Sequence, residues 1–135
     1  GFVTKIQTKG VVLEPLNPLA LGVAENCSFV ARSTSVMPEH LTAMMAEAIK
    51  ADGFALLDIL QPCVSFNKIN TAKWYKERCK ELPPDYDPTD RQAAFAAALK
   101  WGDEIPVGII YRGARRSFED MTTALAGEPL SSLGG

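Results

Sequence analysis

The side chains of this sequence best suited to nucleophilic, redox or metal chemistry are three cysteines and one histidine: Cys27, Cys63, Cys79 and His40. The cysteines form no CxxC pair, and their odd number argues against a disulfide framework and for a reducing compartment. A single histidine excludes a histidine-rich metal site within this chain. The sequence also contains no Walker loop, no GxGxxG motif and no GxSxG motif. We therefore expect its chemistry to depend on a thiol.

Cys63 has the most informative position of the three cysteines, because it follows an apolar run at 54–60 that only Asp58 interrupts. The run is too short for a typical helix and is preceded by Gly53, which favours a strand covered on both faces of a parallel sheet. Pro62 ends the strand because proline donates no hydrogen bond to a ladder. Open α/β sheets place their chemistry at the carboxyl ends of their strands. Cys63 is thus predicted just past the end of a central strand.

The elements that must position this thiol can be predicted from apolar periodicity and from capping residues. Strands are predicted at 27–31, 54–60 and 105–111. Helices are predicted at 18–25, 38–52, 70–82 and 90–101, with a final short helix opening at Ser117. The second helix carries a stripe predicted to face the core: Leu41, Met44, Met45, Ala48 and Ile49. Residues 1–16 are predicted to form a long loop, and residues 128–135 a tail.

Length and composition place the chain among globular α/β proteins. It has 135 residues, of which 47% are hydrophobic and 22% charged, and its net charge of −2 gives no reason to expect nucleic acid as a partner. No apolar stretch approaches the roughly 20 residues that cross a bilayer, so no membrane is expected. Three strands are few for an open sheet. We predict an incomplete, mainly parallel open sheet flanked by helices, with further strands before residue 1 or on another chain.

Several blocks of the sequence resemble a known family. They are NPLAL at 17–21, SFVAR at 28–32, GFALLDILQPCVSFN at 53–67 and WGDEIPVG at 101–108. In this order they resemble the C-terminal half of the β subunit of 2-oxoacid:ferredoxin oxidoreductases, and the similarity runs through nearly the whole chain. The block that contains Cys63 is its most specific part. The resemblance implies that residues 1–135 form the C-terminal portion of one thiamine-diphosphate-binding α/β domain.

The resemblance also implies an activity and a set of cofactors. Enzymes of this family decarboxylate a 2-oxoacid, here 2-oxoglutarate or pyruvate, form acyl-CoA and CO2, and pass electrons to ferredoxin. They use thiamine diphosphate, Mg²⁺ and a [4Fe–4S] cluster, of which Cys63 would be the fourth ligand. The motifs for thiamine diphosphate, for Mg²⁺ and for the other three cysteines are expected before residue 1. The implied partners are the rest of the β subunit, the α subunit, ferredoxin and coenzyme A, in the cytoplasm.

A second segment that resembles the family lies close to the start of the chain. Thr4, Lys5 and Gln7 match a TKGQ segment near the substrate, although Ile6 replaces the glycine, and a β-branched residue resists a positive φ. If the correspondence holds, Lys5 would pair with a distal carboxylate and favour 2-oxoglutarate over pyruvate. The alternative is that these are solvated residues of a loose loop.

Other interpretations of the sequence are open. Cys63 could be a buried thiol that acts as a small hydrophobe. The basic cluster of Arg112, Arg115 and Arg116 could be a solvated face, or could meet an acidic ferredoxin or the phosphates of coenzyme A. The whole chain could be a non-catalytic assembly or interaction module derived from such a subunit, or an unrelated small α/β binding domain. His40 is predicted to lie on the surface.

Overall fold

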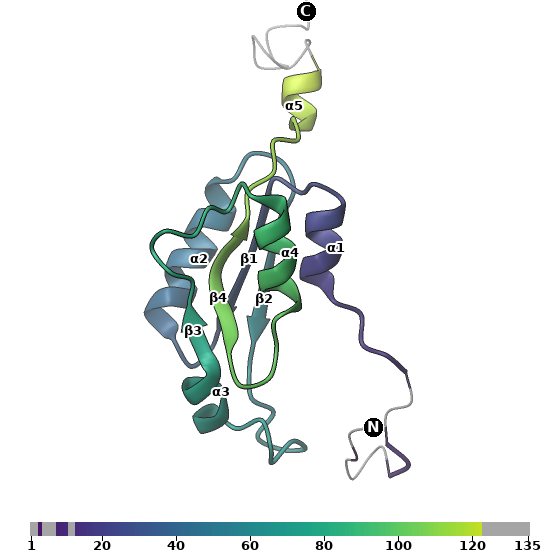
Figure 1. Ribbon diagram of the computed structural model, residues 1–135, viewed down its shortest axis with the longest axis vertical. Helices are drawn as coiled ribbons and strands as arrows, with labels where there is room; N and C mark the ends of the chain where they lie inside the picture. Colours follow the sequence, from purple (N-terminus) through teal and green to yellow (C-terminus); the bar gives the residue numbers. More distant parts are fainter. Residues whose placement is uncertain (1–2, 4–7, 11–12, 123–135) are drawn as a thin grey trace, which may run out of the picture.

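A computed structural model describes residues 3, 8–10 and 13–122, and these form a three-layer α/β arrangement (Figure 1). Helices α1 and α4 lie side by side on one face of the sheet, and α2 covers the other. Side chains of the strand β1 alternate between these layers, because Arg32 reaches the carbonyl of Ala98 on α4 while Ser33 meets His40 on α2. The elements in chain order are α1 (Pro18–Ala24), β1 (Phe29–Thr34), α2 (Pro38–Lys50), β2 (Ala55–Leu60), α3 (Ala72–Arg78), β3 (Cys79–Glu81), α4 (Arg91–Leu99), β4 (Ile105–Tyr111) and α5 (Phe118–Met121).

The four strands form one open sheet in the order β2-β1-β4-β3. The pairs β1–β2 and β3–β4 are parallel, whereas β1 and β4 are antiparallel. The sheet is therefore mixed and mostly parallel, and the predicted fold class is confirmed. The loop after β2 and helix α3 lie at one end of the molecule, and α5 lies at the other (Figure 1).

The predicted helix over 70–82 is wrong at its C-terminal end. Helix α3 stops at Arg78, and Cys79–Glu81 is a strand that pairs with Ile105–Val107. The backbone changes from helical to extended at Cys79, whose ψ is 121°. This strand is only three residues long, so its hydrogen bonds to β4 decide its conformation, and no local pattern identifies it.

The prediction of β2 as a central strand is also wrong within the described part of the chain. There β2 pairs only with β1 and lies at the edge of the sheet, and its side chains are partly buried. Strand β1 is the buried one, since all six of its residues are inaccessible. Hydrophobicity alone does not predict that β1 is buried, because the strand contains Arg32, Ser33 and Thr34. Arg32 and Ser33 are nevertheless buried with side-chain hydrogen-bond partners.

Two expectations for α2 need correction. Met45 and Ile49 of the predicted core stripe are exposed, Ile49 at 83% of its surface, while the other three residues are partly buried. His40 is partly buried and not freely exposed, because its Nδ1 lies 2.8 Å from the Oγ of buried Ser33. Helix α2 thus covers the sheet with Leu41, Met44 and Ala48, while Met45 and Ile49 are left exposed by the described residues.

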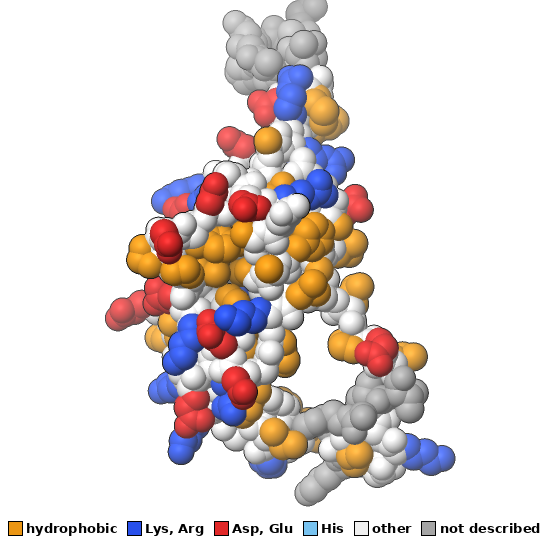
Figure 2. Space-filling model, in the orientation of Figure 1, with side chains coloured by type: hydrophobic (Ala, Val, Ile, Leu, Met, Phe, Trp, Pro, Cys, Tyr) orange, Lys and Arg blue, Asp and Glu red, His pale blue; other side chains and the backbone are white. Residues whose placement is uncertain are grey.

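The larger hydrophobic core lies between α1, α4 and the sheet. Leu19 and Val23 of α1 pack with Val30 of β1, Ile110 of β4 and the small side chains of α4. Asn17 caps α1, since its Oδ1 accepts the N–H of Ala20 at 3.0 Å. Figure 2 shows hydrophobic side chains in a band across the middle of this face, over α1, α4 and the connection between β3 and α4.

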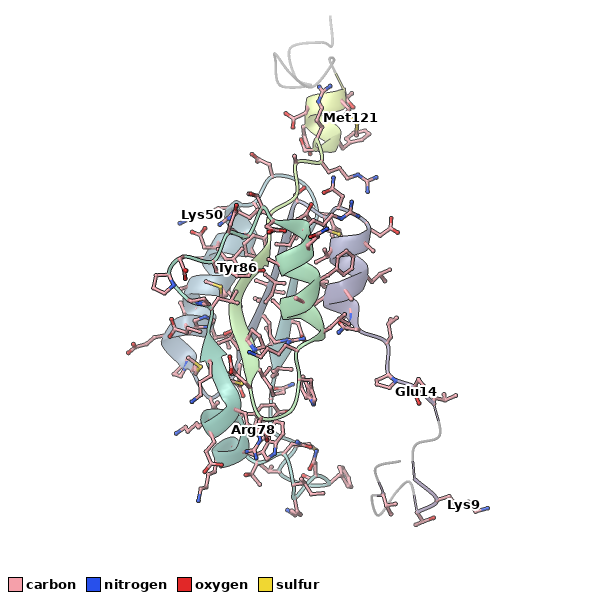
Figure 3. All side chains as sticks on the ribbon, viewed as in Figure 1. Lys9, Glu14, Lys50, Arg78, Tyr86 and Met121 are labelled. Carbon is pink, nitrogen blue, oxygen red and sulfur yellow. The ribbon has the colours of Figure 1, made fainter. Side chains whose placement is uncertain are left out.

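Tyr86 closes one side of this core. Figure 3 shows it beside α4 and β4, with Lys50 and Glu14 pointing away from the body of the molecule. The hydroxyl of Tyr86 donates a 2.7 Å hydrogen bond to the carbonyl of Ile110. Burial, with smaller effects from Asp90 and Asp87, raises the pKa of Tyr86 to about 12.

Candidate functional site

The loop that follows β2 holds Cys63 at the surface of the protein. The strand ends at Leu60, and the side chain of Asn67 then organises the turn. The Oδ1 of Asn67 accepts the N–H groups of Ile69 and Asn70 at 2.9 Å, and the backbone N–H of Asn67 donates to the carbonyl of Cys63 at 3.1 Å. The alternative of a buried Cys63 is therefore wrong, because the thiol is exposed.

Backbone N–H groups of the loop lower the pKa of the Cys63 thiol and so favour its thiolate. The N–H of Phe66 lowers the pKa of this thiol most, the N–H groups of Asn67 and Ser65 act in the same direction, and Lys68 adds a small electrostatic contribution. Partial desolvation opposes them. The thiolate is the form that binds metals and attacks electrophiles, so this loop prepares the sulfur for either role.

The other two cysteines lie in the opposite environment. Cys27 and Cys79 are buried, and burial raises the pKa of each thiol above its ordinary value. Inert structural cysteines have this character. Among the three thiols, Cys63 is thus the one with the exposure and hydrogen bonding of a functional group.

Exposed apolar side chains border the Cys63 loop. Val64, Phe66 and Ile69 all point outward, although none belongs to a regular element. An apolar border around a metal centre limits solvent access and tunes its reduction potential. The loop therefore presents an exposed thiol of lowered pKa next to apolar side chains, which fits one ligand of an iron–sulfur cluster.

One thiolate does not make a metal centre. No group of three or more histidine, cysteine, aspartate or glutamate side chains is positioned to hold a metal within the described ranges. A cluster at Cys63 would need its remaining ligands from outside those ranges. Its role as a cluster ligand stays a prediction.

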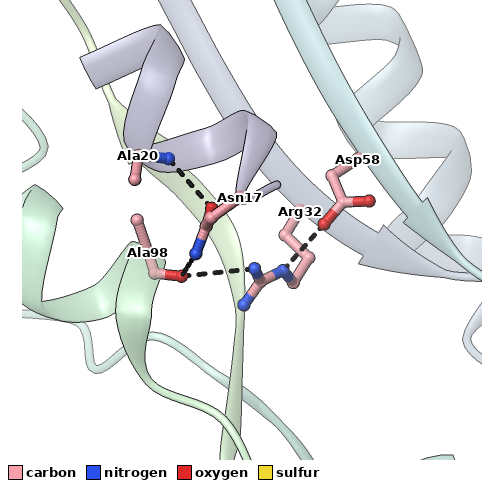
Figure 4. Close-up of polar contacts among 5 residues, drawn as sticks. All are labelled: Asn17, Ala20, Arg32, Asp58 and Ala98. Carbon is pink, nitrogen blue, oxygen red and sulfur yellow. Dashed lines mark hydrogen bonds and ion pairs between the residues drawn. The ribbon is translucent and has the colours of Figure 1, made fainter. Parts of the chain in front are cut away.

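A second constellation, which the sequence did not reveal as a site, is built around Arg32 of β1. Asp58 of β2 is its direct register partner, and Arg32 Nε donates to Asp58 Oδ2 at 3.0 Å. Nη2 of the same guanidinium donates to the carbonyl of Ala98 at 3.4 Å, and Asn17 Nδ2 donates to that carbonyl at 3.0 Å (Figure 4). A lone charge in each of two adjacent apolar strands is the pattern that could have identified this pair.

The three arginines of the predicted basic cluster each have a partner within the fold. Arg112 binds Glu47 of α2 at 2.8 Å, and the hydrogen bond from Arg112, aided by Lys50, lowers the pKa of the Glu47 carboxyl. Arg115 donates to the carbonyl of Glu25, and Arg116 donates to that of Asp120. Each arginine thus holds a different part of the fold, which favours the structural interpretation.

The remaining predicted site residues, Thr4, Lys5 and Gln7, lie outside the described residues, as does Ile6. Their role near the substrate stays a prediction. In the described part of the chain, no helix is both long and apolar enough to cross a membrane.

Comparisons with known proteins agree with the resemblance found in the sequence. Residues 63–127 match the family model for the C-terminal region of the pyruvate ferredoxin oxidoreductase β subunit. The β subunit of a 2-oxoacid:ferredoxin oxidoreductase from Sulfolobus is 39% identical over 110 residues, which are 73% of this chain and 36% of that protein. A β subunit from Aeropyrum pernix is 40% identical over 109 residues, 73% of this chain and 34% of that protein.

A 2-oxoglutarate oxidoreductase subunit, KorB, from Mycobacterium tuberculosis is 33% identical over 81 residues, 60% of this chain and 22% of that protein. Among solved structures, the 2-oxoglutarate:ferredoxin oxidoreductase from Magnetococcus marinus, with 2-oxoglutarate, coenzyme A and succinyl-CoA bound, superposes with a TM-score of 0.79. That match covers 96% of this chain and 48% of the other at 24% identity, so it shows the fold.

The expected resemblance to the C-terminal half of a 2-oxoacid:ferredoxin oxidoreductase β subunit is confirmed by these comparisons. These relatives are enzyme subunits. The enzyme to which the KorB subunit belongs is named for 2-oxoglutarate. The chain spans about a third of the length of the two curated relatives it matches at 39% and 40% identity.

Proposed function

We propose that this chain, as the C-terminal part of such a β subunit, works in a 2-oxoacid:ferredoxin oxidoreductase. The reaction is the oxidative decarboxylation of a 2-oxoacid to acyl-CoA and CO2, with electrons delivered to ferredoxin. The observation that carries the proposal is the exposed Cys63 thiol, with a lowered pKa, in a loop at the carboxyl end of a strand.

In this proposal Cys63 supplies one thiolate to a [4Fe–4S] cluster, and the other three cysteines come from the preceding part of the complete subunit. The N–H groups of Phe66, Asn67 and Ser65 donate toward its sulfur, and hydrogen bonds to a cluster sulfur tune its potential. The cluster would supply one-electron transfer toward ferredoxin. The residues of this chain hold and shield it.

The other parts of the site are assigned to residues and subunits outside the described chain. Thiamine diphosphate and Mg²⁺ would be bound by the N-terminal part of the β subunit, with 1–16 as a loop on the cofactor side and 128–135 as a tail. Lys5, with Thr4 and Gln7, would contact the substrate, and a lysine there favours 2-oxoglutarate over pyruvate. The partners are the α subunit, ferredoxin and coenzyme A, and the enzyme would act in the cytoplasm.

The test uses the complete protein that carries this chain, purified without oxygen together with its partner subunit. Cys63→Ser removes the thiolate, and Ser65→Ala is the matched control, because it alters the same loop but keeps the backbone N–H that faces the sulfur. We expect Cys63→Ser to lose most of the bound iron and the electron paramagnetic resonance signal of the reduced protein, while its near-ultraviolet circular dichroism stays native. Ser65→Ala should keep all three.

The cluster assignment fails if Cys63→Ser retains the iron content and the reduced-state signal of the unaltered protein. The same preparation addresses the alternative of a non-catalytic module. A protein that binds the cluster but releases no CO2 from either 2-oxoglutarate or pyruvate, with coenzyme A and ferredoxin present, would favour that alternative.

A further inference from the structure

A cavity of about 540 Å³ opens where α1 begins and α4 ends, beside the carboxyl halves of β1 and β2. Leu16, Leu99 and Trp101 form apolar walls, and Arg32 and Asp58 provide the polar groups. Strands β1 and β2 are parallel, so both direct their carboxyl halves toward the same end of the sheet. Ligands of open α/β sheets bind outside the carboxyl ends of the strands. Apolar walls with a few convergent polar groups are typical of ligand pockets.

The guanidinium of Arg32 has hydrogen-bonding capacity that the described residues do not use. Its side chain is 4% exposed, and its Nε and Nη2 are engaged by Asp58 and by the carbonyl of Ala98. Its Nη1 is buried and has no hydrogen-bond partner among the described residues, and it carries no dashed line in Figure 4. Buried donors of this kind are nearly always paired in a functional protein.

The charges in the cavity restrict what can pair with that donor. Arg32 and Asp58 neutralise each other, so an anion near Nη1 would gain from Arg32 and be repelled by Asp58. A cation at the same place would be attracted by Asp58 and repelled by Arg32. A neutral group that both accepts and donates a hydrogen bond suits the pair, because Arg32 supplies an N–H and Asp58 has an oxygen besides the one that Arg32 binds.

We propose that this cavity binds a secondary amide attached to an apolar group. The amide oxygen accepts from Arg32 Nη1, the amide N–H donates to Asp58, and the apolar group packs against Leu16, Leu99 and Trp101. The amide has two possible sources, a peptide group of another polypeptide segment or a small amide ligand. This proposal does not rest on the cluster assignment at Cys63.

Trp101 is the aromatic wall of the cavity beside the guanidinium of Arg32. Its ring centre lies 5.7 Å from the guanidinium carbon of Arg32, and its side chain is 55% exposed. Since Nη1 itself is closed to solvent, binding requires the groups around the guanidinium to rearrange, and the Trp101 ring lies beside it. The indole N–H resonance of Trp101 is therefore the natural reporter, and Trp101→Phe assigns it against Trp74, the second tryptophan.

The experiment compares three probes that share one isobutyl group: N-methylisovaleramide, methyl isovalerate and isovalerate. Each is titrated into the purified chain while the Trp101 indole resonance is followed. We expect the amide to bind with a dissociation constant on the order of millimolar, as fragments of this size do. The ester, which lacks the donor, should bind more weakly, and the anion should bind at least about tenfold more weakly than the amide.

Asp58→Asn provides the sharper test, because it keeps the shape and removes the charge that neutralises Arg32. The order of amide and anion should reverse in this variant. Glu104→Gln is the matched control, since it also removes one carboxylate, from a 2.8 Å ion pair with Lys100 that is not part of the cavity wall. It should keep the order of the unaltered chain. Native near-ultraviolet circular dichroism is required of both variants.

The same titration on the complete protein distinguishes the two sources. If N-methylisovaleramide still shifts Trp101, the cavity is a small-ligand site; if the resonance is already displaced and no longer responds, a polypeptide segment supplies the amide. Equal affinity for the three probes, no response in the isolated chain, or an unchanged order in Asp58→Asn would overturn the proposal.

Discussion

Removal of Asp58 alone should destabilise this chain more than the simultaneous removal of Asp58 and Arg32. In Asp58→Ala, the guanidinium of Arg32 would keep only a 3.4 Å hydrogen bond to Ala98 while its side chain stays almost fully buried. Leaving a buried charge without its partner costs about 3 to 5 kcal/mol of unfolding free energy. Asp58 is 23% exposed, so water can partly replace it, and we expect the lower end, about 3 kcal/mol.

Arg32→Met should cost less, although it alters the more buried residue. It removes the charge itself and leaves Asp58, which water can reach. The loss is then that of the hydrogen bonds to Asp58 and Ala98, about 1 to 2 kcal/mol. The double variant should lose a similar amount, because it contains no buried unpaired charge. It should therefore be about 1 to 2 kcal/mol more stable than Asp58→Ala.

Urea unfolding followed by far-ultraviolet circular dichroism measures these differences, provided the slopes of the transitions are equal. Lys100→Met with Glu104→Ala is the matched control, because that pair is also close, at 2.8 Å, but about half exposed. Its two changes should be additive to within about 0.5 kcal/mol. Additive losses at Arg32 and Asp58 as well would refute the assignment of a buried, mutually dependent pair.

Three further outcomes can be measured on the same chain. Iodoacetamide should modify Cys63 first, and its reaction should persist to lower pH than that of the other two cysteines, because its lowered pKa keeps a thiolate present; mass spectrometry of peptides after timed quenching would detect the reverse order. Tyr86→Phe should cost about 1 kcal/mol through the lost bond to Ile110. Because the pKa of Tyr86 is raised to about 12 in the folded protein, the stabilisation from its hydroxyl should be complete below pH 10 and should be lost between pH 10 and about 12. Unfolding free energies measured at several pH values test this. Asn17→Ala should cost about 1 to 2 kcal/mol, because both the cap of α1 and the bond to Ala98 are lost, and thermal unfolding near that of the unaltered chain would contradict this.

Local patterns in the sequence were sufficient for most of the elements. The cap at Asn17, the positive φ of 88° at Gly53, the strand before Pro62 and the exposed turn that follows it depend on neighbouring residues alone. The resemblance to 2-oxoacid:ferredoxin oxidoreductase β subunits likewise rested on short blocks, of which the one around Cys63 is the most specific.

The placement of β2 at the edge, the short strand at Cys79–Glu81 and the exposure of Ile49 all depend on which distant segments meet. Strand pairing is decided by contacts across the chain, and these override local propensity where a segment is short or half-covered.

The sequence by itself determined that a thiol follows a strand, because that order is written along the chain. Only the tertiary structure decided which backbone N–H groups face that thiol, and that Arg32 lies buried against Asp58 beside a cavity. The ion pair requires two residues 26 positions apart in the sequence to meet in space. The environment of the thiol requires a particular conformation of its loop. Spacing along a sequence fixes direction and local shape, but the energy of a buried charge depends on everything packed around it.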